Sequence, residues 1–250
     1  MKKRHNILFL FSLLLVGCNN QQVSQENVES SEIFSDNNSE YSSDSTESEI
    51  IDSSDSNLDN SYSESEEKLE YIYFNKEIKM YINPSVQYSN LYASKLGNEG
   101  EHMNIISNIL VDLLTEYTNL IIYANNSFPG QSLSKSVKES NSLDVDYHLS
   151  LHSNAGGGKG SEGWHTNSSK EFTKSILDSF DKILPYKTRG LKYGGTSLYE
   201  LKNTKASASL IEILFHDDPY QAKFIVDNYY EIALAIYEGV ISYFSSYIKK

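Results

Sequence analysis

The segment 145–158 constrains the fold more than any other part of the chain. Apolar and polar residues alternate over 145–152, and a period of two is typical of a β-strand. His148 and His152 are four residues apart and therefore lie on the same side of that strand. The segment 154–158 ends in three glycines. We therefore expect His152 at the carboxyl end of a strand, the edge at which open α/β sheets bind ligands.

The first eighteen residues have the pattern of an export signal. Residues 2–5 are basic and residues 7–16 are apolar, a run too short to span a membrane as a helix. The end of this segment resembles a bacterial lipoprotein signal, in which Cys18 is lipidated and becomes the mature amino terminus. The alternative is an ordinary signal with an incidental cysteine. We predict a lipoprotein signal peptide over 1–18 and a protein exported and lipid-anchored to the outer face of the cytoplasmic membrane, facing the cell wall.

Residues 19–67 form an acidic segment rich in Ser, Asp, Glu and Asn, without helical or strand periodicity, and we predict a disordered linker. It holds 14 of the 34 acidic residues and no basic residue, whereas residues 68–250 hold 20 acidic and 18 basic residues. The formal charge of −13 therefore comes from the linker. This near-neutral remainder argues against a nucleic-acid partner, which requires a basic face.

Residues 68–250 have the length of one domain. Cys18 is the only cysteine, so this domain has no intramolecular disulfide. Strands that alternate with helices predict an α/β fold with a mostly parallel sheet covered by helices on both faces. The patterns predict strands at 71–74, 77–82, 120–123, 145–152 and 209–215 and a loop over 84–98. They also predict one helix that begins at Glu99 and three further helices at 132–140, 172–184 and 221–248.

Three residues indicate chemistry. Glu212 lies within the apolar strand 209–215, and a buried carboxylate is costly unless it is paired, hydrogen bonded or bound to a metal. Glu99 begins a helix, where any acidic residue favours the helix dipole. His152 offers a neutral nitrogen of the kind that zinc binds. Taken singly, Glu99 is an ordinary helix-start acid and His152 an ordinary surface histidine.

At these positions the chain resembles the zinc-dependent N-acetylmuramoyl-L-alanine amidases of the amidase 3 type, over Tyr81 to Tyr247. The resemblance implies a single catalytic domain with a mixed, mainly parallel sheet flanked by helices. It also implies a zinc ion that activates water to cut the amide between the muramic acid lactyl group and L-alanine in peptidoglycan. It rests on Asn98-Glu99, Ser150-Leu-His-Ser-Asn-Ala155 with the glycines after it, Ser161-Glu-Gly163 and Ile211-Glu-Ile-Leu-Phe-His-Asp217.

Residue by residue, the resemblance places Glu99 and His152 on zinc ligands and Glu212 on the catalytic glutamate. A zinc-bound water has a lowered pKa, and a nearby carboxylate can accept its proton. Peptidoglycan is the expected partner, beside the membrane that holds the lipid anchor. Because no oligomer signal is present, we expect a monomer.

One departure concerns the first zinc histidine, which the family carries in a Gly-His-Gly-Gly loop. Here the loop 83–90 contains no histidine. Gln87 offers an amide oxygen, which zinc binds less readily than imidazole or carboxylate. His148 is about 13 Å along the strand from His152, so a supporting or simply buried role suits it better. The third ligand therefore stays open between Gln87, His148 and none. The loop also resembles a variant in some amidases of Gram-positive bacteria and their phages.

The remaining histidines are weaker candidates. His102 follows Glu99 at helical spacing, and His165 and His216 follow segments near the expected site, but the ordinary reading of each as a polar residue is stronger. The leading hypothesis is a zinc amidase. The alternative is a catalytically inactive lipoprotein of the same fold that binds peptidoglycan. A solute-binding lipoprotein fits less well, because such proteins usually have two lobes and a longer chain.

Overall fold

The computed structural model describes residues 69–249. The predicted signal peptide, the lipidation site at Cys18 and the linker 19–67 lie outside these residues. Within the described range, no helix combines the length and the apolar character needed to cross a membrane.

One six-stranded sheet forms the centre of the described domain, with the strand order β2-β1-β3-β6-β4-β5. Neighbouring strands are parallel except β4 and β6, which are antiparallel. The predicted mixed, mainly parallel sheet is therefore confirmed. The strands are β1 (Lys79–Pro84), β2 (Ile121–Ala124), β3 (Tyr147–Asn154), β4 (Glu162–His165), β5 (Leu191–Tyr193) and β6 (Ser207–Phe215).

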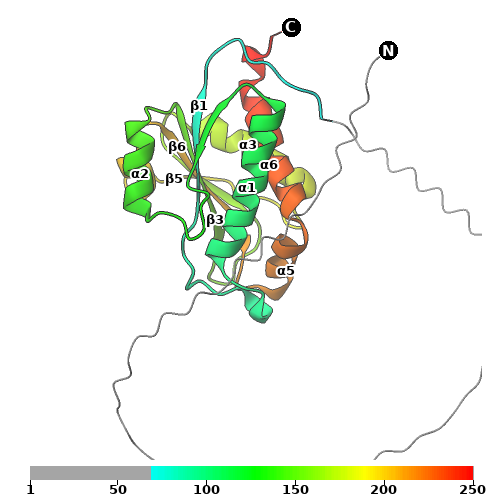
Figure 1. Ribbon diagram of the computed structural model, residues 1–250. Helices are drawn as coiled ribbons and strands as arrows, with labels where there is room; N and C mark the ends of the chain where they lie inside the picture. The colour runs from blue at the N-terminus through cyan, green and yellow to red at the C-terminus, as the bar shows by residue number, and fades with distance from the viewer. Residues whose placement is uncertain (1–68, 250) are drawn as a thin grey trace, which may run out of the picture. The chain divides into compact units, whose positions relative to one another are not determined.

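Helices cover both faces of this sheet, as predicted. The long helices α1, α3 and α6 pack together on one face, and the short helices α2 and α4 lie on the other (Figure 1). The helices are α1 (Glu99–Tyr117), α2 (Leu133–Ser142), α3 (Lys170–Ile183), α4 (Tyr199–Asn203), α5 (Pro219–Asp227) and α6 (Tyr229–Phe244), with 3₁₀ turns at Ala93–Lys95 and Ser245–Tyr247.

The main core lies between the sheet and the long helices. Leu149 and Leu151 of β3 pair with Ser209 and Ile211 of β6, and both leucines are fully buried. Burying a side chain of this size stabilises the fold by about 1.5–3 kcal/mol. Because strand side chains alternate, the residues between these leucines point to the opposite face, under α2 and α4. That second face, the polar face, carries the buried polar residues of the candidate site beside a smaller apolar cluster of Leu201, Ala208 and Leu210.

The structure corrects two predicted elements. The strand at 71–74 is wrong: only Ile72 and Phe74 form bridges, each with a single partner, so no ladder develops. The helix over 221–248 is two helices, because Asn228 has non-helical dihedral angles and caps the end of α5 with a side-chain bond to the Phe224 carbonyl. The short elements β4, β5 and α4 had no sequence prediction, since three to five residues carry too little periodicity.

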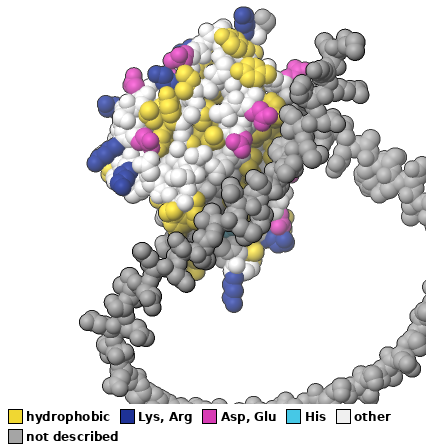
Figure 2. All heavy atoms as spheres, viewed as in Figure 1, with side chains coloured by type: hydrophobic (Ala, Val, Ile, Leu, Met, Phe, Trp, Pro, Cys, Tyr) yellow, Lys and Arg dark blue, Asp and Glu magenta, His cyan; other side chains and the backbone are white. Residues whose placement is uncertain are grey.

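Charged side chains of both signs are interspersed on the visible face of the described domain (Figure 2). This distribution matches the near balance of 20 acidic and 18 basic residues in 68–250.

Candidate functional site

Three strands place three polar side chains in one row on the polar face of the sheet. Glu212 of β6 is the register partner of His152 on β3 and of Glu162 on β4. Register partners point to the same face, so the three side chains lie next to one another about 5 Å apart. His152 lies where β3 reaches its carboxyl end, as the sequence predicts, and the register between β3 and β6 shifts just after it.

Glu99 reaches this row from the start of α1. The Asn98 side chain caps the helix by accepting a bond from the Glu101 amide, which sets Glu99 in the first turn. The Glu99 carboxylate is 1% exposed, and its Oε1 lies 3.0 Å from His152 Nδ1. The Ser153 amide also faces Oε1, at 3.4 Å. The structure therefore brings together the two residues that the resemblance places on zinc.

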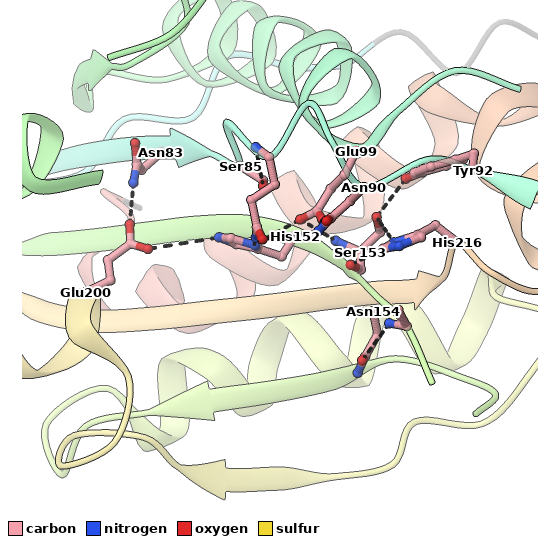
Figure 3. A network of polar contacts seen from close by, with 12 residues as sticks. Asn83, Ser85, Asn90, Tyr92, Glu99, His152, Ser153, Asn154, Glu200 and His216 are labelled. Carbon is pink, nitrogen blue, oxygen red and sulfur yellow. Dashed lines mark hydrogen bonds and ion pairs between the residues drawn. The ribbon is translucent and has the colours of Figure 1, made fainter. Parts of the chain in front are cut away.

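The loop after β1 brings two amides to the same point. Gln87 Nε2 lies 3.3 Å from His152 Nδ1, and Asn90 Nδ2 donates to Gln87 Oε1 at 3.1 Å and to Glu99 Oε2 at 2.7 Å. A half-turn of the Gln87 amide presents its carbonyl oxygen to the same place and breaks the bond that Asn90 donates to Gln87 Oε1. Figure 3 shows Asn90 beside Glu99, with His152 between Glu99 and Glu200.

The Glu99–His152 contact shifts both groups toward their charged forms. Burial alone would raise the pKa of Glu99, but bonding to His152 and Asn90 lowers it. Burial alone would lower the pKa of His152, but bonding to Glu99 and the charges of Glu200 and Glu212 raise it. Both shifts therefore favour a carboxylate at Glu99 and an imidazolium at His152.

Glu212 differs from its neighbours because its buried Oε2 has no hydrogen-bond partner among the described residues. Burial raises the pKa of Glu212 to about 7, and the charges of Glu99 and Glu162 add to this effect while His152 and Lys192 oppose it. A carboxyl group with this pKa can accept and release a proton near neutral pH.

Glu200 is a buried carboxylate that the sequence prediction missed. It lies on α4, and its Oε1 accepts bonds from His148 Nε2 at 2.7 Å and from Asn83 Nδ2. Its Oε2 lies 4.0 Å from His152 Nε2, on the opposite side of the ring from Glu99 (Figure 3). Burial would raise the pKa of Glu200, but bonding to His148 and the charges of His148 and His152 lower it. No periodicity marks Glu200, because α4 has only five residues.

His148 contacts Glu200 and the Ser140 hydroxyl, and it is fully buried. Its ring stacks on Tyr81, with ring centroids 5.3 Å apart. Both of its nitrogens are therefore engaged away from Glu99. This position fits the supporting role considered for His148.

The other histidines also have partners of their own. His102 contacts the Tyr229 hydroxyl and the Leu96 carbonyl, each at 2.6 Å. His216 lies 3.0 Å from the Ser153 hydroxyl, and His165 faces the Thr166 carbonyl at 2.8 Å. These contacts support the interpretation of the three histidines as structural polar residues.

The glycine loop after β3 is held by Asp217, which follows β6. The Asp217 carboxylate accepts bonds from the Gly156 and Gly157 amides at 2.8 and 2.9 Å. Both glycines have positive φ, which other residues adopt only with strain. A side chain at Gly158 would overlap the Phe215 ring. The loop therefore ties the carboxyl ends of β3 and β6 together beside His152.

The donors around Glu99 fit a zinc ion in part. Carboxylate and imidazole are ligands that zinc prefers, and Gln87 adds a weaker amide oxygen. Within residues 69–249, no group of three or more His, Cys, Asp or Glu side chains converges in a way that could hold a metal ion. Zinc would thus have two strong protein ligands, Glu99 and His152, and one weak ligand.

The chain is similar to known cell-wall amidases. A family model described as N-acetylmuramoyl-L-alanine amidase matches residues 90–242. The N-acetylmuramoyl-L-alanine amidase CwlM of Bacillus licheniformis is 28% identical over 153 residues, which make up 58% of this chain and 60% of that protein. The chain thus spans less than two thirds of the length of this curated relative.

Solved structures share the fold. The catalytic domain of CwlV, an N-acetylmuramoyl-L-alanine amidase from Bacillus (Paenibacillus) polymyxa var. colistinus, has a TM-score of 0.62 at 18% identity, over 67% of this chain and 98% of that domain. The catalytic domain of the CD27L endolysin, which targets Clostridia difficile, has a TM-score of 0.55 at 26% identity, over 66% of this chain and 98% of that domain. The resemblance drawn from the motifs is confirmed.

Proposed function

Because the chain belongs to the N-acetylmuramoyl-L-alanine amidase family, we propose that it hydrolyses the amide between the lactyl group of N-acetylmuramic acid and L-alanine in peptidoglycan. The observation that carries this proposal is the convergence of Glu99, His152 and Glu212 on the polar face of the sheet. A buried carboxylate–imidazole pair lies there beside a carboxyl group with a pKa of about 7. This combination suits the attack of water on an amide.

In this proposal Glu99 and His152 hold a zinc ion, and Gln87 contributes its amide oxygen. Zinc bound at such a site lowers the pKa of water and polarises a carbonyl group. Glu99 and His152 Nδ1 are positioned to bind one ion because they already lie 3.0 Å apart. Asn90 holds Glu99 through Oε2, which leaves Oε1 facing the ring.

Glu212 is the proposed acid/base. Its free Oε2 accepts a proton from water as the water oxygen bonds to the amide carbon. The carbon–nitrogen bond then breaks, and Glu212 returns the proton to the departing nitrogen of L-alanine. The products are a lactyl carboxylic acid and a free amine, and Glu212 regains its initial state.

The replaced zinc histidine favours a second candidate, a catalytically inactive protein that binds peptidoglycan at the same site. Gln87 is a weak ligand, and a site with only two strong ligands holds zinc less tightly than one with three. The two candidates differ in two measurable properties, the ability to retain zinc and the ability to release amino groups from the wall.

The deciding experiment measures zinc by elemental analysis in the purified protein and in a His152→Ala variant. We expect about one zinc per chain, lost in the variant, and release of L-alanine amino groups from purified peptidoglycan by the zinc-containing protein. No bound zinc, even after incubation with excess metal, together with no release from the wall, would favour the binding protein.

We further propose that the protein acts outside the cell as a lipid-anchored monomer. The signal pattern and Cys18 support the anchor. A Cys18→Ser variant should move from the membrane fraction to the soluble fraction of exported protein. Unchanged membrane association of that variant would exclude a lipid anchor on Cys18.

A further inference from the structure

Two cations lie beside the proposed site and share one carboxylate. Arg189 Nε and Lys192 Nζ each approach Glu162 Oε2 at 2.7 Å. Glu162 is nearly buried, whereas the side chains of Arg189 and Lys192 are 40% and 38% exposed. One carboxylate neutralises one of these cations, so the cluster keeps a net positive charge that solvent or a ligand can reach.

The guanidinium group of Arg189 has unused donors. Among residues 69–249, its hydrogen bonds go through Nε alone, and its Cζ lies 5.1 Å from the centroid of the Phe215 ring. The two terminal amino groups remain free to bind an anion, and their planar geometry suits a carboxylate. Lys192 Nζ lies 5.0 Å from the centroid of the Trp164 ring, so the lysine side chain runs along the sheet toward β4.

The cluster belongs to the face that carries the site. Glu162 is the register partner of Glu212, so it lies one strand beyond Glu212 and about 10 Å from His152. Lys192 is the register partner of Trp164, which points to the same face as Glu162 because it is two residues further along β4. The cations therefore lie on the β4–β5 side of the proposed acid/base.

We propose that Arg189 and Lys192 bind the free carboxylate of the residue that follows L-alanine in the stem peptide. This inference rests on the proposed function, because it takes the cut to occur between His152 and Glu212. N-acetylated sugars carry no charge and the lactyl carboxyl group is tied up in the amide, so the peptide is the anionic part of the substrate. Two extended residues span about 7 Å, which reaches from the cut to the cations. The peptide therefore lies over β4 and β5, and the glycan over the opposite side of the site.

The test compares two soluble substrates, both N-acetylmuramoyl-L-alanyl-D-glutamate with the γ-carboxyl group blocked as a methylamide, one with a free α-carboxylate and one with that group amidated. Charge-assisted hydrogen bonds contribute enough to predict about a tenfold or larger preference for the acid in kcat/KM. Lys192→Met should reduce this preference by raising KM for the acid alone, and any change in kcat through the lost charge near Glu212 should be the same for both substrates. The matched control is Lys174→Met on α3, an exposed lysine on the other face of the sheet.

Equal losses on both substrates in Lys192→Met would overturn the subsite, because a structural role does not distinguish them. If that variant is unstable, Arg189→Lys keeps the charge beside Glu162 but removes the planar fork, and it should also reduce the preference. Wild-type protein that cuts neither these substrates nor purified peptidoglycan would refute the proposed function, not the subsite. Calorimetry with the α-acid and α-amide forms of L-alanyl-D-glutamate γ-methylamide then decides, and equal binding of the two forms would overturn the subsite.

Discussion

Glu162 and Glu212 are register partners on adjacent strands, yet their protonation behaviour differs. Burial would raise the pKa of Glu162, but Lys192 and Arg189 hold it below its usual range. Glu212 has no cation of its own, and burial raises its pKa to about 7. Two neighbouring carboxyl groups whose surroundings separate their pKa values are typical of acid/base sites, in which one group stays charged and the other exchanges protons.

The first prediction concerns Glu212. Glu212→Gln should lower wall hydrolysis by about 10²–10⁴-fold, the usual contribution of a general acid/base, because the amide cannot carry the proton. Zinc content and the unfolding midpoint should stay close to wild type. Glu231→Gln, at an exposed position on α6, is the control and should retain full activity. Undiminished hydrolysis in Glu212→Gln would remove Glu212 from the mechanism.

The second prediction concerns acid stability. Because the pKa of Glu162 is lower in the folded protein than its ordinary value of 4.5, its ion pairs stabilise the fold above that pH. This stabilisation is lost as pH falls through the folded pKa. Urea unfolding at a series of pH values should therefore show Glu162→Gln less stable than wild type at pH 7, with the difference shrinking below about pH 4.5. A difference that is the same at pH 7 and pH 3 would contradict this account of the pair.

A third prediction addresses the amide that replaces the family's histidine. Gln87→Leu should lower zinc affinity by about tenfold or more, because loss of a residue that only hydrogen bonds to a metal ligand already lowers metal affinity by about 10–100-fold. Titration with a chelator competitor measures this affinity. Ser89→Ala, an exposed change in the same loop, should leave it unchanged. Equal zinc affinity in Gln87→Leu and wild type would show that Gln87 is not a ligand.

The fourth prediction concerns the buried pair of His148 and Glu200. Glu200→Leu should reduce the free energy of unfolding by about 3–5 kcal/mol, because the fully buried His148 then lacks its partner. His148→Phe keeps the ring stacked on Tyr81. The double variant should lose less stability than the two single variants together, since neither side chain is then left buried without its partner. Strict additivity in urea unfolding would show that the two residues do not interact.

Much of the fold could be predicted from local patterns. The apolar residues of α1 recur every three or four positions, and Met103, Ile106, Leu110 and Leu114 are all fully buried. Asn98 marks the start of this helix by its capping side chain. The conformation of 71–74 could not be predicted in this way. A short apolar run does not show whether a neighbouring segment continues beside it to form a ladder, and here Ile72 and Phe74 each form a single bridge.

Spacing along the chain is enough to predict that His148 and His152 share a side of one strand, that Glu99 begins a helix, and that Glu212 is an acidic residue within an apolar strand. These are properties of residue spacing and residue chemistry, which hold over a few neighbouring positions. The position of Glu212 between His152 and Glu162, and the approach of Glu200 to His152 from a five-residue helix, become visible only in the folded chain. Strand register and the placement of short elements depend on packing between segments far apart in the chain, and no local pattern contains that information.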